Sequence, residues 1–87
     1  MQQQQEKALK QVGNILKGMR QANRLEHGRV ASSIGCAVDI IRKAERGRIL
    51  TRDQLERVIQ YFNPRGENLE VLEELLCDAF PSSRSAS

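Results

Sequence analysis

The sequence predicts an all-α fold: one small domain of five helices. Apolar residues recur at helical spacing, most clearly at Leu9, Val12, Leu16 and Met19, which follow one another at intervals of three, four and three. No segment alternates apolar and polar residues as a half-buried strand does. With 87 residues there is room for one modest core, and because aromatic residues make up only 3% of the chain, that core must be aliphatic.

The first helix is expected over residues 6–23, on the apolar stripe just described. Residues 1–5 are a glutamine-rich polar run and are expected to form a disordered N-terminal tail. Gly13 and Gly18 lie inside the helix, and each weakens it by roughly 1 kcal/mol relative to alanine. Packing against the rest of the domain must therefore supply the missing stability.

Two short helices are expected next, over residues 27–33 and 37–46. Gly47 should end the second of them as a left-handed cap. The residues that these helices should bury are Val30, Ala31, Ile34, Ile41 and Ala44.

The fourth helix begins at a capping box, in which the side chains of Thr51 and Gln54 each serve a backbone N–H of the other residue. It should end at Asn63, because a proline follows. The fifth helix is expected over residues 68–80, and the polar residues 81–87 should form a disordered tail.

Residues 29–47 fit a helix-turn-helix at three positions, Ala31, Gly35 and Ile41. Two short helices that meet at a steep angle need a small residue where the first passes under the second. They also need a residue that tolerates positive φ in the turn and an apolar residue that anchors the second helix. The second helix of such a unit usually lies in the major groove of DNA.

The chain resembles the phage-repressor or Cro-type helix-turn-helix family, also called the xenobiotic-response-element family. The resemblance covers residues 12–63 and is carried by Ile15, Leu16, Lys17, Arg20, Val30, Ala31, Gly35, Ile41, Glu45, Arg46, Gly47, Leu55, Ile59 and the aromatic end of the fourth helix. It implies a lambda-repressor-like DNA-binding domain, here residues 6–63, that acts as a homodimer on a two-fold-related operator and regulates transcription. It also implies a structural ion pair between Arg20 and Glu45.

Charge is distributed unevenly along the chain. Residues 1–63 hold twelve Lys or Arg against six Asp or Glu, a net charge of +6, whereas residues 64–87 hold two Arg against five acids, a net charge of −3. A basic body with an acidic end favours a polyanionic partner, here double-stranded DNA, for the first part only.

If the third helix enters the major groove, its early exposed residues face base edges. Val38 would meet a thymine methyl, Asp39 would accept from a cytosine amino group, and arginine or lysine would donate to guanine. Alternatively, Asp39 complements the helix dipole, or Lys43 pairs with it one turn later. The candidate base contacts are Ala37, Val38, Asp39, Arg42 and Lys43.

Phosphate contacts are expected at the start of the second helix, where backbone N–H groups point at an anion, and in the loop after the third helix. Three arginines within seven residues around this loop suggest a clamp on the DNA backbone; the alternative is a solvated loop. The candidate phosphate contacts are His27, Arg29, Arg46, Arg48 and Arg52.

The fifth helix carries more apolar residues than one helix needs against a small core. The surplus, within residues 64–80, is expected to join a second copy in a two-fold dimer. The alternative is that the helix only covers the core of its own chain. The candidate interface residues are Leu69, Leu72, Leu75, Leu76 and Phe80.

No catalytic residues, cofactor or metal site are expected. Cys36 lacks the base and the orienting group that a nucleophile needs, and it should lie in the core. Cys36 and Cys77 are far apart without C-x-x-C spacing, and His27 is the single histidine. No apolar run is long enough to cross a membrane and no signal peptide is evident, so a cytoplasmic protein is expected.

Two functions follow from these patterns. The first is a sequence-specific DNA-binding regulator, a repressor or autoregulator of phage, plasmid or mobile-element type. The alternative is a protein-binding module, such as an antitoxin-like partner of a toxin. It would use the apolar surface of Val38 and Ile40 on the third helix together with the acidic fifth helix.

Overall fold

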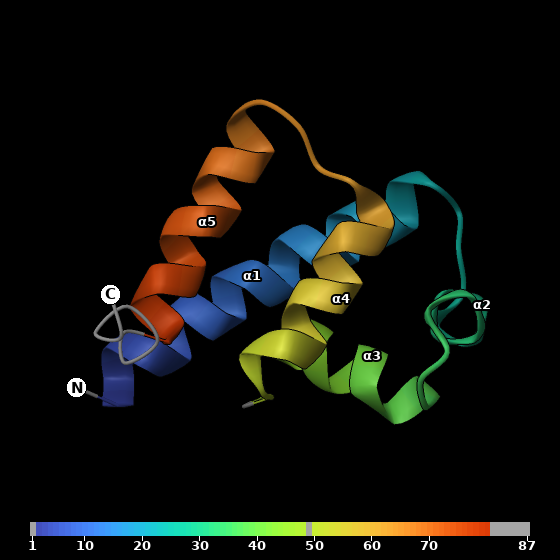
Figure 1. Ribbon diagram of the computed structural model, residues 1–87, viewed down its shortest axis with the longest axis horizontal. Helices are drawn as coiled ribbons and strands as arrows, with labels where there is room; N and C mark the ends of the chain where they lie inside the picture. The colour runs from blue at the N-terminus through green and yellow to red at the C-terminus, as the bar shows by residue number, and fades with distance from the viewer. Residues whose placement is uncertain (1, 49, 81–87) are drawn as a thin grey trace.

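The computed structural model describes residues 2–48 and 50–80, and within them it contains helices and no strand (Figure 1). The helices are α1 (Gln2–Ala22), α2 (His27–Ile34), α3 (Val38–Arg46), α4 (Arg52–Phe62) and α5 (Glu67–Ala79). The prediction of an all-α domain with five helices is confirmed. The expected C-terminal tail, residues 81–87, lies outside the described residues.

Helix α1 runs along the molecule (Figure 1). Helices α5 and α3 pack against it most extensively and α4 more lightly, whereas α2 packs against α3 and α4. The end of α5 returns to the start of α1, where Nε2 of Gln5 donates a hydrogen bond of 2.7 Å to the carbonyl oxygen of Ala79. Segments from opposite ends of the sequence therefore lie side by side.

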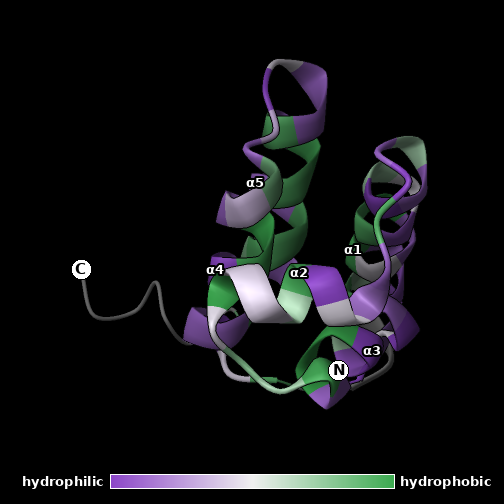
Figure 2. Ribbon diagram, turned by 90° about the vertical axis from the view of Figure 1, so that its right-hand side faces the viewer, coloured by the Kyte–Doolittle hydropathy of each residue, from purple (hydrophilic) through white to green (hydrophobic). Residues whose placement is uncertain are grey.

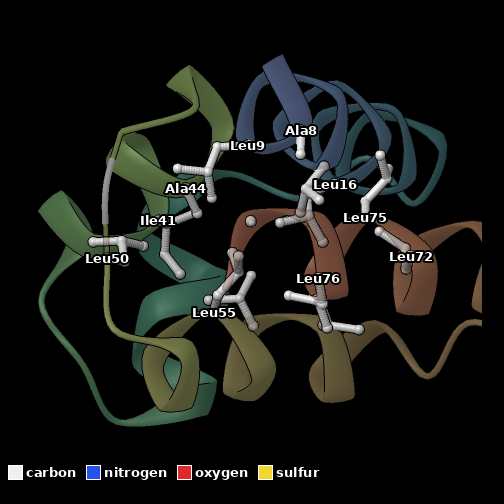
Figure 3. Close-up of a cluster of buried hydrophobic side chains, with 14 of the residues drawn as sticks. Ala8, Leu9, Leu16, Ile41, Ala44, Leu50, Leu55, Leu72, Leu75 and Leu76 are labelled. Atoms are coloured by element: carbon white, nitrogen blue, oxygen red, sulfur yellow. The ribbon is translucent and has the colours of Figure 1, made fainter. Parts of the chain in front are cut away.

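The core is aliphatic, as the composition predicts. Figure 3 shows side chains from α1, α3, α4 and α5 meeting in one cluster. Leu16, Ile41, Leu55 and Leu72, one from each of these helices, are at most 2% exposed. Among the residues that the structure describes, no polar or charged residue is buried with them.

Helix α1 begins four residues earlier than the sequence predicts. Residues 2–5, expected in a disordered tail, are helical. Ala8 and Leu9 are only 3% and 2% exposed, because α5 and α3 pack against α1. The glutamine run is polar, but it directly precedes the turn of α1 that holds Ala8 and Leu9. Because distant helices pack against that turn, the helix extends back through the glutamines, and the prediction of a disordered tail for residues 2–5 is wrong.

The helix ends are set by the local signals that predict them. Gly35 and Gly47 follow α2 and α3 with left-handed φ values of +87° and +75°. The hydroxyl of Thr51 accepts a hydrogen bond of 3.1 Å from the backbone N–H of Gln54, whose side chain accepts one of 3.2 Å in return. The ends of α2 to α5 fall within one residue of the predicted positions.

Gly13 lies where α1 crosses the C-terminal end of α3. A Cβ atom at Gly13 would lie 2.5 Å from the carbonyl oxygen of Glu45 and 2.7 Å from that of Ala44. A Cβ atom at Gly47 would likewise lie 2.8 Å from Cα of Lys10. The two backbones are therefore in direct contact, and at Gly13 this packing is what the sequence requires to offset the weakening of the helix.

Helix α5 completes the core of its own chain. Leu72, Leu75 and Leu76 are 0%, 9% and 6% exposed, and Figure 3 shows them within the cluster between α1 and α4. Their assignment to a dimer interface is therefore wrong, because a buried side chain offers no surface to a second copy. Hydrophobic and hydrophilic residues lie on different sides of α5 (Figure 2), but Leu69 remains 38% exposed and Phe80 is half-buried.

Candidate nucleic-acid interface

Helices α2 and α3 are joined by the tight left-handed turn that the sequence predicts. The carbonyl oxygen of Ala31 accepts hydrogen bonds from the backbone N–H groups of Gly35 at 2.8 Å and Cys36 at 3.0 Å. Ala31 is 3% exposed, while Ile41 and Ala44 on α3 are 1% and 2% exposed. Helix α3 is therefore fixed from behind, and its opposite face is turned to solvent.

The outward face of α3 is cationic. Arg42, Lys43 and Arg46 are exposed along it, and Ala37 is exposed as the N-cap residue. Asp39 lies on the same face, and its carboxylate is 3.3 Å from the ammonium group of Lys43, so the predicted i,i+4 pair is present. Both side chains are about half exposed or more, so the pair adds little stability and is readily exchanged for contacts with a partner.

Val38 and Ile40 contribute less to this surface than the sequence predicts. Both are half-buried and pack against the core. Val38 therefore offers only part of its side chain to a thymine methyl group. The apolar patch on which a protein-binding function would depend is reduced for the same reason.

Arg20 and Glu45 form the ion pair that the family resemblance implies. Nε of Arg20 donates to Oε2 of Glu45 at 2.6 Å, and Nη2 donates to Oε1 at 3.3 Å. Nη1 of Arg20 also donates to the carbonyl oxygen of Leu25 at 2.8 Å. The two side chains are only 11% and 8% exposed, so this hydrogen-bonded pair holds the end of α3 to α1 and to the segment before α2.

His27 is a second partner of the same carboxylate. Its Nε2 lies 3.1 Å from Oε1 of Glu45, and its side chain is 34% exposed. The sequence suggests only a phosphate contact at this position, because it does not show that the start of α2 lies beside the end of α3. Arg29, the other candidate phosphate contact on α2, is exposed.

The three arginines of the expected loop clamp do not all line one hollow. Arg46 and Arg48 line one hollow beside α1. Arg52 instead places its Nε 3.0 Å from Oε2 of Glu56 and lines a different hollow, between α4 and α5. Arg52 does not share a hollow with Arg46 and Arg48, because it opens α4 and follows the direction of that helix; its contact with a phosphate stays a prediction.

Two lysines of α1 join the basic surface and are absent from the sequence-based candidates. Lys10 lines a hollow with Arg46 and Arg48, and Lys17 lines another with Arg42 and Arg46. Their spacing of seven residues is the signal that could have placed them on one face of α1. Only the fold shows that this face adjoins α3.

The other kinds of site to consider in residues 2–48 and 50–80 are a reactive cysteine, a metal site and a membrane-spanning helix. Cys36 and Cys77 are free and half-buried, so Cys36 lies at the edge of the core rather than inside it. No group of three or more His, Cys, Asp or Glu side chains there is placed to hold a metal ion. None of the helices in these ranges has both the length and the hydrophobicity needed to cross a membrane.

Comparisons of the chain with protein-family models, with curated proteins and with solved structures gave no match. The function is therefore inferred from the exposed cations of α3, the pair of Arg20 and Glu45, and the basic hollows beside α1. The family resemblance depends on the motif within residues 12–63 alone.

Proposed function

We propose that this chain is a sequence-specific DNA-binding regulator of transcription that reads duplex DNA with the outward face of α3. The observation that carries the proposal is the exposure of Arg42, Lys43 and Arg46 on a short helix anchored from behind by Ile41 and Ala44. The major groove admits one α-helix, and its guanine edges accept hydrogen bonds from arginine and lysine. By resemblance, the regulator is a repressor or autoregulator of phage, plasmid or mobile-element type.

The rigidity of α3 favours this function over a flexible charged surface. The pair of Arg20 and Glu45 fixes the end of the helix, and the hydrogen bonds to Ala31 fix the turn before it. A helix whose backbone is already held in place loses less conformational entropy when it binds. The face of α3 is therefore suited to selecting one base sequence rather than attracting any polyanion.

We propose in addition that the regulator acts as a homodimer. After the core is formed, Leu69 and Val71 of α5 are still 38% and 40% exposed, and Tyr61 of α4 is 36% exposed. Leu69, which borders the hollow between α4 and α5, is the exposed apolar side chain through which we propose that α5 contacts a second copy. A two-fold dimer would present two α3 helices to half-sites about one DNA turn, roughly 34 Å, apart.

The proposal is tested by selecting duplexes from a random pool with the purified protein and sequencing those retained. A regulator of this kind should enrich one sequence with two related halves, and its affinity should fall steeply as salt rises. Arg42→Ala should weaken binding by about 1–3 kcal/mol and relax the preference at one position. Arg57→Ala, an equal loss of charge on the exposed side of α4, is the matched control and should leave binding unchanged. Failure to enrich any sequence at moderate salt would contradict the proposal.

A further inference from the structure

Two hollows lie along the line where α1 crosses α3, and Arg46 borders both. The larger has a volume of about 660 Å³, and we call it the α1–α3 hollow; its lining residues are Glu6, Lys10, Lys43, Arg46, Gly47 and Arg48. The smaller, of about 240 Å³, lies beside Lys17, Arg42 and the pair of Arg20 and Glu45. The α1–α3 hollow therefore brings four cationic side chains together with a single acidic one.

Lys10 is placed at this hollow by the close approach of two backbones. Because a Cβ atom on Gly47 would lie 2.8 Å from Cα of Lys10, this lysine stands directly against the turn that ends α3. Lys17 follows seven residues later on the same face of α1, about 10.5 Å along the helix axis.

Most cations along this line have no acidic partner within the described part of the chain. Among the basic side chains that border the two hollows, Arg20 and Lys43 form ion pairs, and His27 contacts the carboxylate of Glu45. No ion pair with another described residue is formed by the remaining five, which are Lys10, Lys17, Arg42, Arg46 and Arg48. Uncompensated like charges around a concave surface raise the local potential and concentrate a polyanion there.

We infer that the two hollows along the crossing of α1 and α3 hold the sugar-phosphate backbone of the duplex just outside the bases that α3 reads, with Lys10 of the larger hollow and Lys17 of the smaller as phosphate-binding residues. This inference rests on the proposed function and names a part of the site that the helix-turn-helix itself does not contain. Arg46 ends α3 and borders both hollows, so a strand that leaves the α3 surface passes from Arg42 and Arg46 to the two lysines. Helix α1 thereby widens the DNA footprint.

The test measures binding to the selected duplex by fluorescence anisotropy over a salt series from about 50 to 200 mM. Loss of one phosphate contact lowers the slope of log affinity against log salt by about 0.9. Lys10→Gln and Lys17→Gln should each produce this change while leaving the ratio of selected to unrelated affinity unaltered. Lys10→Arg, which keeps the charge, should retain the wild-type slope, and so should the control Arg57→Gln.

Circular dichroism melting of each variant checks that the fold is kept, since both lysines are exposed. Hydroxyl-radical footprints should lose protection only at the outer phosphates in Lys10→Gln. If wild-type protein binds the selected duplex but both lysine variants keep its slope and footprint, the inference is overturned and the proposed function stands. If the wild-type protein selects no duplex, the proposed function itself fails.

Discussion

Replacing Gly13 with alanine separates the effect of helix propensity from that of helix packing. Propensity alone favours the change, because alanine stabilises a helix interior by roughly 1 kcal/mol relative to glycine. The structure opposes it, since the new Cβ would lie 2.5 Å from the carbonyl oxygen of Glu45, whereas real Cβ contacts essentially never fall below 3.0 Å. The three obstructing atoms, on Ala44 and Glu45, all belong to the backbone, so no rotamer change relieves the overlap.

The magnitude follows from the displacement that the alanine would force. Helices α1 and α3 must separate by about half an ångström, and forced shifts of a packed core typically cost about 1–3 kcal/mol. We take the upper part of that range because the contact is backbone against backbone and adjoins Val12 and Leu16, which are fully buried. After the propensity gain, Gly13→Ala should lower the free energy of unfolding by about 2 kcal/mol. For a domain of this size that lowers Tm by on the order of 10 °C.

Gly18→Ala is the matched control, because it lies in the same helix but its added Cβ would meet no atom within 4 Å. It should raise the free energy of unfolding by roughly 1 kcal/mol and Tm by about 5 °C. Thermal and urea unfolding followed by circular dichroism measure both variants against the wild type. If Gly13→Ala melts at or above the wild-type temperature, the close crossing of α1 over α3 is wrong.

Further predictions concern the ion pair and the exposed side of α5. Arg20→Ala should lower the free energy of unfolding, measured by urea titration, by about 3 kcal/mol. This value is the lower end of the range for breaking a largely buried ion pair, because His27 still contacts Glu45 in the variant. Unchanged melting would show that the pair is not structural. Leu69→Asp should keep its helical signal but sediment at half the wild-type mass, and an unaltered dimer mass would exclude this side of α5 as the interface. Leu72→Asp should instead unfold the chain, because that side chain is fully buried.

The ends of α2 and α3 and the start of α4 were determined by the sequence itself, unlike the start of α1. The caps at Gly35, Gly47 and Thr51 depend on residues within one helical turn, so their signals are complete in the local sequence. The same holds for the amphipathic pattern that defines each helix. The partnership of Arg20 and Glu45 spans 25 residues and followed from the family resemblance rather than from any local pattern.

The tertiary structure alone decided what covers each apolar face and which charged faces adjoin. Helical periodicity marks Leu72 and its neighbours as apolar, but it does not distinguish a core of one chain from an interface between two. Likewise, nothing in the sequence distinguishes Gly13 and Lys10 from other residues of a helix. Because α1 crosses α3 closely, position 13 requires a glycine and Lys10 becomes part of the basic surface. The physical reason is that these contacts join segments far apart in the chain, so the residues near each position in the sequence carry no signal of the contact.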